Sequence, residues 1–539
     1  MRVPPPFFCC AIGLVAWGLL PRPVAAAPPT LTYLFPAGAQ QGKTVEVTAG
    51  GTFERWPVQA WAAHKGVEIK PAKDKGKFTI TVSADAAPGT CWVRLSDEQG
   101  ASALRPFIVG TLPEVMEQEP NDDPKKPQVL PSSSVVVNGR LDKAGDVDCF
   151  AVKLAKDETL VASLEANRTL GSPMDGVLQL LSADGFVLEE NNDDHGLDPQ
   201  LIFTAPKDGS YVVRVFAFPA DPDASIRFAG GETYIYRLTL TTGGFADHAF
   251  PLAVSRTDPE QVEVIGWNVP EAAKKLTVKP DAGSDVVTLW HPRLANTVSV
   301  LVEPHRCVVG AKPNDRKRPQ PIALPVTISA GIDPPGEIDT YEFAAKKGQR
   351  LVFRADARSI GSQLDPLLRL TDAAGKSLAQ ADDATAGKVG TRDAELAFAV
   401  PQDGNYRIEV RDLAGHGSFR HFYRLRAVLA EPDYVLVVAA DRFTVAAGKP
   451  LDVPVTVERR NGFEREVEIA VEGLPAGVTA TAKTLGKSVS LRLEAKGPAS
   501  SAFRIVGTVA GRADLTRIAT APSAAFPPAT PHLWLTVTK

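Results

Sequence analysis

The chain has 539 residues, and its 59 Lys and Arg against 63 Asp and Glu give a formal net charge of −4, without the basic excess typical of nucleic-acid-binding proteins. Its 43 Gly, 45 Pro and 44% hydrophobic residues predict a globular protein that is rich in turns and poor in long helices. At roughly 100 to 200 residues per domain, this length predicts about three to five domains, and a single large catalytic domain is not favoured.

The first 27 residues have the features of a secretory signal peptide. Arg2 precedes an apolar run from Phe7 to Leu20, and the alanines at 25–27 supply the small residues that a signal peptidase needs. No later stretch approaches the roughly 20 apolar residues of a membrane-spanning helix. We therefore expect an exported chain without a membrane span, secreted or located at the cell surface or in the periplasm.

Three cysteines remain after the leader, namely Cys91, Cys149 and Cys307. An odd number spread so widely excludes a disulfide framework, although one isolated bridge stays open. Cys91 and Cys149 each precede an apolar, strand-like segment. We therefore expect these two thiols to be small buried hydrophobic groups.

A small β unit is expected directly after the leader. Phe78, Ile80 and Val82 alternate with polar residues, which is the period of a half-buried strand. Elements of this unit, such as the Phe-Pro pair at 35–36, return more weakly at 250–251. Two small immunoglobulin-like sandwiches are the simplest interpretation.

A larger unit occurs twice. The segment at 145–150 recurs at 336–341, a spacing of 191 residues, and the segment at 205–215 matches 400–410. In both copies an Asp-Gly turn precedes alternating apolar residues, which predicts short antiparallel strands. A sandwich or jelly roll of about eight strands fits this length and turn spacing.

The C-terminal part adds a fifth β unit and a Pro-rich end. The chain is therefore expected to be all-β, a tandem array of jelly-roll-like and immunoglobulin-like β-sandwiches. The expected organisation is a signal peptide at 1–27, an immunoglobulin-like sandwich at 30–112, a first large sandwich at 113–242, a small immunoglobulin-like sandwich at 243–309, a second large sandwich at 310–430, an immunoglobulin-like sandwich at 433–511 and a loose tail at 512–539 that ends in a short strand.

Motifs of the first large unit resemble those of the bacterial pre-peptidase C-terminal domain. They are Glu-Gln-Glu-Pro-Asn-Asp at 117–122, Asp-Val-Asp at 146–148 and Pro-x-Asp-Gly-x-Tyr at 206–211. The second large unit resembles the family less completely. The flanking units at 30–112 and 433–511 resemble IPT/TIG-type and bacterial surface immunoglobulin-like modules.

The resemblance implies a jelly-roll-like sandwich similar to the collagen-binding domains of clostridial collagenases. In this family, such sandwiches usually accompany the catalytic domains of secreted enzymes. They bind or orient substrate, or are removed during maturation, and do not carry out the chemistry.

Acidic residues of the first large unit are candidates for a calcium site. Alternation along an extended chain places three side chains of 117–122 on one side, and calcium takes roughly six to eight oxygen ligands. In the collagenase relatives the matching linker binds calcium, so the resemblance implies the same. The candidate ligands are Glu117, Glu119, Asn121, Asp122, Asp146 and Asp148.

An alternative interpretation of these acidic residues remains open. The two acidic segments could be solvated loops at opposite ends of a sandwich. In the second large unit Gly310 and Lys312 stand where Glu117 and Glu119 would be, so we expect calcium binding to be weak or absent there. A second acidic stretch, at 189–194, is interpreted as an exposed loop.

Candidate ligand-binding residues are only weakly indicated. Phe216, Phe218 and Phe228 flank an insertion at 217–231 that the second large unit lacks, and insertions on rigid sandwiches often carry binding. The alternative is that these rings form the core of a longer hairpin.

Sequence motifs of common catalytic sites are absent, among them Gly-x-Ser-x-Gly and His-Glu-x-x-His. The closest histidines, His416 and His421, lie in a Gly/Ser-rich turn, where a zinc or catalytic role is not favoured. Five β units also leave no room for a catalytic domain.

We therefore predict a non-catalytic exported protein, stabilised by calcium, that binds an extracellular protein or polysaccharide or acts as a surface scaffold. Nucleic acid is not an expected partner. Two alternatives remain: a secreted peptidase or other hydrolase, or an accessory part of one, and a structural protein of the cell envelope.

Overall fold

The computed structural model describes residues 27–221, 227–257, 260–280, 285–383, 393–485, 488–522 and 529–539. The expected signal peptide lies almost entirely outside these residues. Regular structure in the described ranges is nearly all β-strand, which confirms the predicted fold class of tandem β-sandwiches. The short helices are α1 (Asn167–Leu170), η1 (Glu271–Ala273) and η2 (Arg358–Ile360), and no described helix is long and apolar enough to cross a membrane.

Sandwich 1 packs two sheets with the strand orders β1-β3-β6-β5 and β2-β9-β7-β4, and β8 pairs with β7. Phe78, Ile80 and Val82 all point into its core, as their alternation predicts. Its strands are β1 (Tyr33–Phe35), β2 (Gly38–Gln40), β3 (Thr44–Gly50), β4 (Gln59–Ala62), β5 (Val67–Pro71), β6 (Lys77–Val82), β7 (Gly89–Asp97), β8 (Gly100–Ala101) and β9 (Arg105–Gly110).

Sandwich 2 contains the first large unit. Its two five-stranded sheets have the orders β10-β12-β19-β14-β17 and β11-β13-β18-β15-β16. Its strands are β10 (Glu114–Met116), β11 (Gln128–Val129), β12 (Val135–Arg140), β13 (Asp148–Leu154), β14 (Thr159–Glu165), β15 (Met174–Leu181), β16 (Val187–Asn191), β17 (Gln200–Thr204), β18 (Gly209–Pro219) and β19 (Ile235–Thr241).

Sandwich 4 contains the second large unit and repeats this topology strand for strand. Its sheets have the orders β26-β28-β35-β30-β33 and β27-β29-β34-β31-β32. Its strands are β26 (Cys307–Val309), β27 (Gln320–Pro321), β28 (Val326–Gly331), β29 (Asp339–Ala345), β30 (Arg350–Asp356), β31 (Pro366–Asp372), β32 (Ser377–Ala381), β33 (Ala394–Ala399), β34 (Gly404–Asp412) and β35 (Phe422–Leu429).

The Pro-x-Asp-Gly-x-Tyr signature has a structural role in both copies. The Tyr211 hydroxyl donates to the carbonyl of Lys207 at 2.9 Å, and the Tyr406 hydroxyl donates to that of Gln402 at 2.8 Å. In each copy, the signature aspartate accepts a hydrogen bond from a backbone N–H in the turn that follows the neighbouring strand of the sheet. Asp208 accepts this bond from Lys156, which follows β13, at 2.7 Å. The motif therefore closes the corner before β18 and β34.

Sandwich 3 is the smallest, with two three-stranded sheets of order β20-β22-β23 and β21-β25-β24. Cys307–Val309, which the sequence assigned to this unit, instead forms β26 and pairs with β28 of sandwich 4. The strands of sandwich 3 are β20 (Phe245–Phe250), β21 (Ala253–Ser255), β22 (Glu260–Trp267), β23 (Lys275–Val278), β24 (Val286–Leu289) and β25 (Val298–Glu303).

Sandwich 5 includes strands from the segment at 512–539. The expectation that this segment is loose was wrong, whereas the short strand expected at its end is present. β44 pairs with β37 and β42, and β43 pairs with β42, because their apolar residues complete the core. Its strands are β36 (Asp433–Val438), β37 (Arg442–Ala446), β38 (Pro450–Arg460), β39 (Glu468–Glu472), β40 (Val478–Leu485), β41 (Ser488–Ala495), β42 (Ala499–Val509), β43 (Arg512–Ile518) and β44 (Leu533–Thr538).

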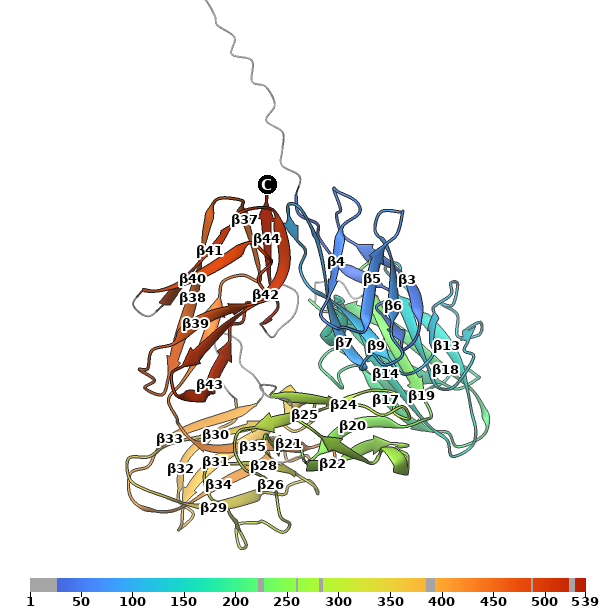
Figure 1. The fold of residues 1–539 in the computed structure, drawn as a ribbon. Coiled ribbons are helices and arrows are strands. Elements are labelled where there is room, and N and C mark those ends of the chain that lie inside the picture. Colours follow the sequence, from blue (N-terminus) through green and yellow to red (C-terminus); the bar gives the residue numbers. More distant parts are fainter. Residues whose placement is uncertain are drawn as a thin grey trace, which may run out of the picture.

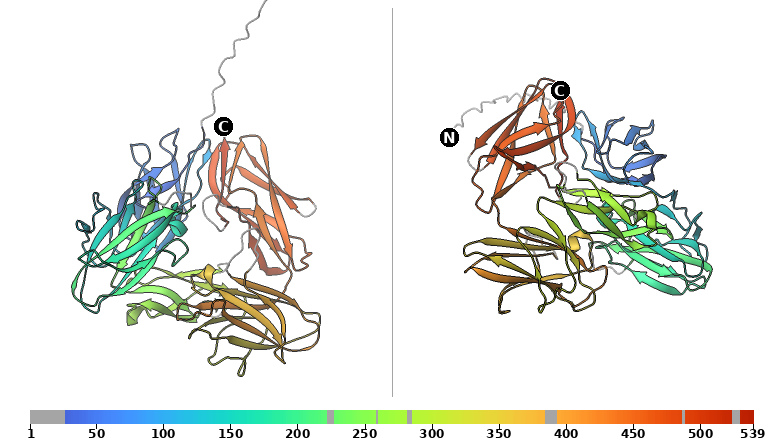
Figure 2. Two further views of the ribbon diagram at one scale, coloured as in Figure 1. Left: turned by 180° about the vertical axis from the view of Figure 1, so that it is seen from behind. Right: turned by 60° about the horizontal axis from the view of Figure 1, so that its bottom comes forward.

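The five sandwiches form a closed array rather than an open string. Figure 1 shows sandwich 5 (red) beside sandwich 1 (blue), and the views in Figure 2 agree. At this junction the buried Arg94 guanidinium, 1% exposed, donates to Asp441 at 2.7 Å and to the carbonyl of His532 at 3.1 Å. The rings of Trp61 and Trp534 meet edge to face at 6.1 Å.

Arg94→Ala tests the closing junction. Asp441 would keep only the partly exposed Arg442 as a cationic partner, so we expect a loss of roughly 2–4 kcal/mol, below the cost of an isolated buried charge. Thermal melting and small-angle scattering should show a lower Tm and a larger radius of gyration. Arg55→Ala, which breaks an exposed pair of the same sandwich, is the control and should change little. If melting and scattering were unchanged in Arg94→Ala, this contact would not stabilise the junction between sandwiches 1 and 5.

Candidate metal centre

The two acidic segments of sandwich 2 lie together at one edge of the fold. The backbone N–H of Glu117 donates to Asn138 of β12 at 3.0 Å, and that of Cys149 in β13 donates to the Asn121 carbonyl at 3.1 Å. These bonds hold residues 117–122 against the start of β13, where Asp146 and Asp148 lie fully buried. The alternative of two separate solvated loops therefore does not describe this arrangement.

Carboxylate oxygens gather here in two groups. Oxygens of Glu117, Glu119 and Asp148 lie within 4.8 Å of one another, and so do those of Glu119, Asp122 and Asp146. Glu119 belongs to both groups. We call these five carboxylates, with the amide of Asn121, the acidic cluster.

Several oxygens of the acidic cluster lack a partner among the described residues. Buried and without a hydrogen bond are Glu117 Oε1, Asn121 Oδ1, Asp146 Oδ1 and Asp148 Oδ1. The other oxygens of Glu117 and Asp148 are held, at 2.7 Å by the N–H of Arg140 and at 2.5 Å by the Tyr236 hydroxyl. Such half-satisfied buried acceptors are costly unless something else binds them.

The charges of the acidic cluster are poorly balanced by the protein. Burial raises the pKa of Glu117 to about 7, and the nearby Glu119 carboxylate adds to this shift. Burial, followed by the charge of Glu117, also raises the pKa of Asp148. Lys143 approaches Asp146 only at 3.9 Å from a largely exposed position. The cluster is therefore strained by repulsion when its carboxylates are ionised.

Sandwich 4 places a lysine in the same location. Lys312, at the position of Glu119, extends its ammonium to Asp339 at 2.6 Å, to Glu337 at 2.8 Å and to the carbonyl of Gly331 at 2.9 Å. Asp339 and Glu337 occupy the positions of Asp148 and Asp146. One protein cation thus contacts both of these carboxylates and offsets one of their two negative charges.

The position of Glu117 is closed in sandwich 4. A Cβ added to Gly310 would lie 2.7 Å from the Cβ of Ala330 and 2.9 Å from the Tyr341 hydroxyl. In sandwich 2 the corresponding positions are Gly139 and Phe150, which lack that methyl group and that hydroxyl. The second copy therefore lacks both the carboxylate and the room for it.

The other candidate residues are placed differently. Phe216, Phe218 and Phe228 form one ring cluster on the outer face of β18, with centroids 4.5 to 6.2 Å apart, and Phe216 is 7% exposed. Part of their insertion, at 222–226, lies outside the described residues. For Phe216 the geometry fits the packed-hairpin alternative, while Phe218 and Phe228 are half-buried.

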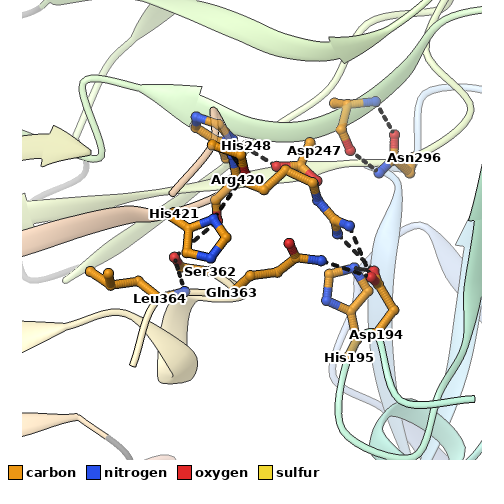
Figure 3. A network of polar contacts seen from close by, with 12 residues as sticks. Asp194, His195, Asp247, His248, Asn296, Ser362, Gln363, Leu364, Arg420 and His421 are labelled. Carbon is orange, nitrogen blue, oxygen red and sulfur yellow. Dashed lines mark hydrogen bonds and ion pairs between the residues drawn. The ribbon is translucent and has the colours of Figure 1, made fainter. Parts of the chain in front are cut away.

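The second acidic stretch is not a simple exposed loop. Residues 189–191 belong to β16, and Asp194 accepts two hydrogen bonds, at 2.9 and 2.7 Å, from Arg420 of sandwich 4. Arg420 also donates to Asp247 of sandwich 3 at 2.8 Å (Figure 3). Its guanidinium lies over the Trp267 ring. Sequence reasoning missed this three-domain contact, because a partner 226 residues away leaves no local signal.

A crevice of about 690 Å³ lies where sandwiches 1 to 4 meet. The outer face of one sandwich 2 sheet lines it with a cross-strand row of Val136, Thr239, Ser163 and Gln200. Gln200 is 3% exposed, and its Nε2 has no hydrogen-bond partner in the described structure. This row of the crevice wall is thus uncharged, while charged side chains line other parts of the crevice, among them Glu165, Arg168, Asp198, Arg237 and Asp247.

The same row in sandwich 4 is charged. Thr327, Arg426, Arg354 and Glu395 are its members in register. Arg354 pairs with Asp356 and Glu395, and Arg426 with Glu303, so the long side chains cover this sheet face with ion pairs. Where sandwich 4 has two arginines, sandwich 2 has Ser163 and Thr239, which leaves space.

Lys312→Met tests the internal cation of sandwich 4. Asp339, fully buried, would keep only the Tyr423 hydroxyl, so we expect a loss of about 2–3 kcal/mol at neutral pH. The loss should shrink in acid, because Asp339 is then protonated in both variants. Urea unfolding at both pH values measures it. Lys317→Met, an exposed change in the same segment, is the matched control.

Comparison with known proteins gives a local family match. The model of the bacterial pre-peptidase C-terminal domain matches residues 337–412. A probable subtilase-type serine protease of Deinococcus radiodurans is 28% identical over 242 residues, which are 44% of this chain and 26% of that protein. The match therefore spans about a quarter of the relative.

Solved structures match this chain at low identity and with low TM-scores. The pre-peptidase C-terminal domain of a Bacillus anthracis collagenase is 13% identical, with 20% of this chain and 92% of that domain covered and a TM-score of 0.15. The insect immune protein hemolin is 11% identical, with 92% and 99% covered and a TM-score of 0.21. On the match of the family model, the chain carries a bacterial pre-peptidase C-terminal domain at residues 337–412, within sandwich 4.

Proposed function

We propose that this protein is an exported, non-catalytic binding protein whose sandwich 2 is stabilised by calcium. The main support for calcium binding by sandwich 2 is the contrast between the two copies. Sandwich 2 gathers five carboxylates with several unpartnered oxygens, whereas sandwich 4 neutralises the same location with Lys312. A bound cation would do in sandwich 2 what the lysine does in sandwich 4.

The donor set favours calcium over softer metals. All members of the acidic cluster offer carboxylate or amide oxygens, and hard cations such as calcium prefer these to nitrogen or sulfur ligands. Two overlapping oxygen groups that share Glu119 also suit a large ion with a high coordination number. The proposed ligands remain Glu117, Glu119, Asn121, Asp122, Asp146 and Asp148.

The crevice beside sandwich 2 supports the binding part of the proposal. Ligand sites commonly lie at domain junctions, in cavities of roughly 300 to 1,000 Å³. The Thr239–Ser163–Gln200 row offers hydroxyl and amide groups, and the neighbouring Arg237 is already paired with Glu114 and Glu165. These groups can hydrogen-bond the hydroxyls of a polysaccharide segment, which is the ligand that we propose for this crevice.

A second role is favoured by one comparison. Part of this chain is similar to part of a probable subtilase-type serine protease. The protein could therefore serve as the non-catalytic companion of a secreted peptidase, in which case the crevice would bind that enzyme's substrate.

Calcium titration of the chelator-treated full chain tests the metal centre. We expect binding by calorimetry, at least about tenfold weaker in Glu119→Gln than in the wild type and unchanged in the exposed control Glu189→Gln. Absence of binding heat together with an unchanged Tm would refute the calcium proposal.

The acidic cluster also determines whether the stability of the calcium-free protein rises or falls with pH. The pKa of Glu117 is raised to about 7, so the calcium-free protein should lose stability as pH rises through that value. Calcium removes this loss, and the increase in Tm on adding calcium should therefore be larger at about pH 8 than at about pH 5.

A cavity-filling variant tests the crevice. The double variant Ser163→Arg and Thr239→Arg gives sandwich 2 the two arginines that sandwich 4 has at these positions. We expect the wild type to be retained on insoluble cellulose, chitin or starch, and the double variant to lose at least about tenfold of that affinity. Calcium titration of the variant verifies that sandwich 2 is folded.

Retention of the wild type on gelatin alone would favour a protein ligand instead. Failure to bind every one of these matrices would count against the binding role without affecting the calcium result.

A further inference from the structure

A second cluster of metal-ligating side chains lies in sandwich 4, outside the acidic cluster and the crevice. Asp412 ends β34, and His416 and His421 follow in the connection to β35. One ligand atom of each of these three residues lies within 4.8 Å of the other two. We propose that Asp412, His416 and His421 form a zinc site that fixes the loop joining three domains.

The donor set is that of a transition metal. Two imidazole nitrogens and one carboxylate oxygen suit zinc, which takes such ligands in a four-coordinate site and can fill a fourth position with water. Calcium and magnesium prefer oxygen-only shells. This triad and the acidic cluster would therefore select different metals.

Two of the three ligands are already oriented by their neighbours. Asp412 is 2% exposed and accepts backbone N–H bonds from Asp365 at 3.0 Å, Ala414 at 3.0 Å and His416 at 2.8 Å. His421 is 8% exposed, and its Nδ1 lies 2.8 Å from the Ser418 hydroxyl. With the proton on Nδ1 donated to that hydroxyl, His421 presents an unprotonated Nε2 as a ligand.

The charge state of the triad also suits metal binding. Burial lowers the pKa of the His421 imidazole. His416 is the exposed member, with its Nδ1 3.8 Å from Asp412, so a small rotation of its side chain can complete the site. A neutral imidazole is the form that a metal binds.

The same loop carries the contact between sandwiches 2, 3 and 4. Arg420 directly precedes His421 and reaches both Asp194 and Asp247, and His421 lies beside it in Figure 3. Phe419 packs edge to face on Trp267 of sandwich 3. A metal that holds residues 412–421 in place would therefore stabilise the position of Arg420 and the domain arrangement that depends on it.

Sandwich 2 supplies an internal comparison. Ala217 stands at the position of Asp412, and no histidine occurs between Pro206 and the end of that sandwich. The zinc site is thus a property of sandwich 4 alone, and it does not depend on whether sandwich 2 binds calcium.

Calorimetric titration with zinc chloride tests the proposal, using the chelator-treated full chain in excess calcium so that the acidic cluster is occupied. We expect one zinc site, weakened at least about tenfold in His416→Gln and in His421→Gln. His416 is exposed, so its substitution leaves the fold intact. The control His305→Gln, a histidine outside the triad, should bind zinc like the wild type.

The second readout is thermal. Zinc should raise the Tm of the wild type and of His305→Gln but not that of His416→Gln. Absence of zinc binding, or equal binding by the wild type and His416→Gln, would overturn the proposed site. Zinc binding without a rise in Tm would overturn its role in holding the loop.

Discussion

Both large sandwiches bury an aspartate at the start of a strand, β13 in sandwich 2 and β29 in sandwich 4, and the rest of each structure must accommodate its charge. Asp148 and Asp339 are fully buried, and each accepts a hydrogen bond from a tyrosine hydroxyl of the facing sheet. Such a charge is stable inside a sandwich only when it is neutralised. The two copies differ in how they meet this requirement, and much of their divergence follows from that difference.

Sandwich 4 meets it with its own side chains. Lys312 reaches Asp339, and on the outer sheet face Arg354 and Arg426 pair with acidic neighbours. Sandwich 2 has Glu119, Ser163 and Thr239 at the corresponding positions, which leaves an acidic cluster in one place and a crevice in the other. Basic residues thus pair with acidic side chains in sandwich 4, and sandwich 2 lacks basic residues at the same three positions.

Contacts between domains hold these surfaces in a defined arrangement. Arg420 joins three sandwiches through Asp194 and Asp247, and Arg94 joins the first sandwich to the last through Asp441. All of these side chains are largely buried, so each pair is shielded from solvent and salt. Sandwiches 1, 3 and 4 lie against the outer face of one sheet of sandwich 2, and the crevice lies between them.

The sequence alone determined the β-class, the duplication and the set of acidic residues, because strand alternation, Asp-Gly turns and repeated motifs are local signals. It also indicated, through Gly310 and Lys312, that the second copy would differ. It indicated the final strand, β44, but misjudged the rest of the C-terminal segment as loose, since β43 is stabilised by the core of sandwich 5 and carries only a short apolar pattern. The crevice, the roles of Arg94 and Arg420, and the meeting of Asp412 with two histidines were decided by tertiary structure. Each depends on side chains from distant strands or on the path of a loop, and neither leaves a periodic trace in the chain.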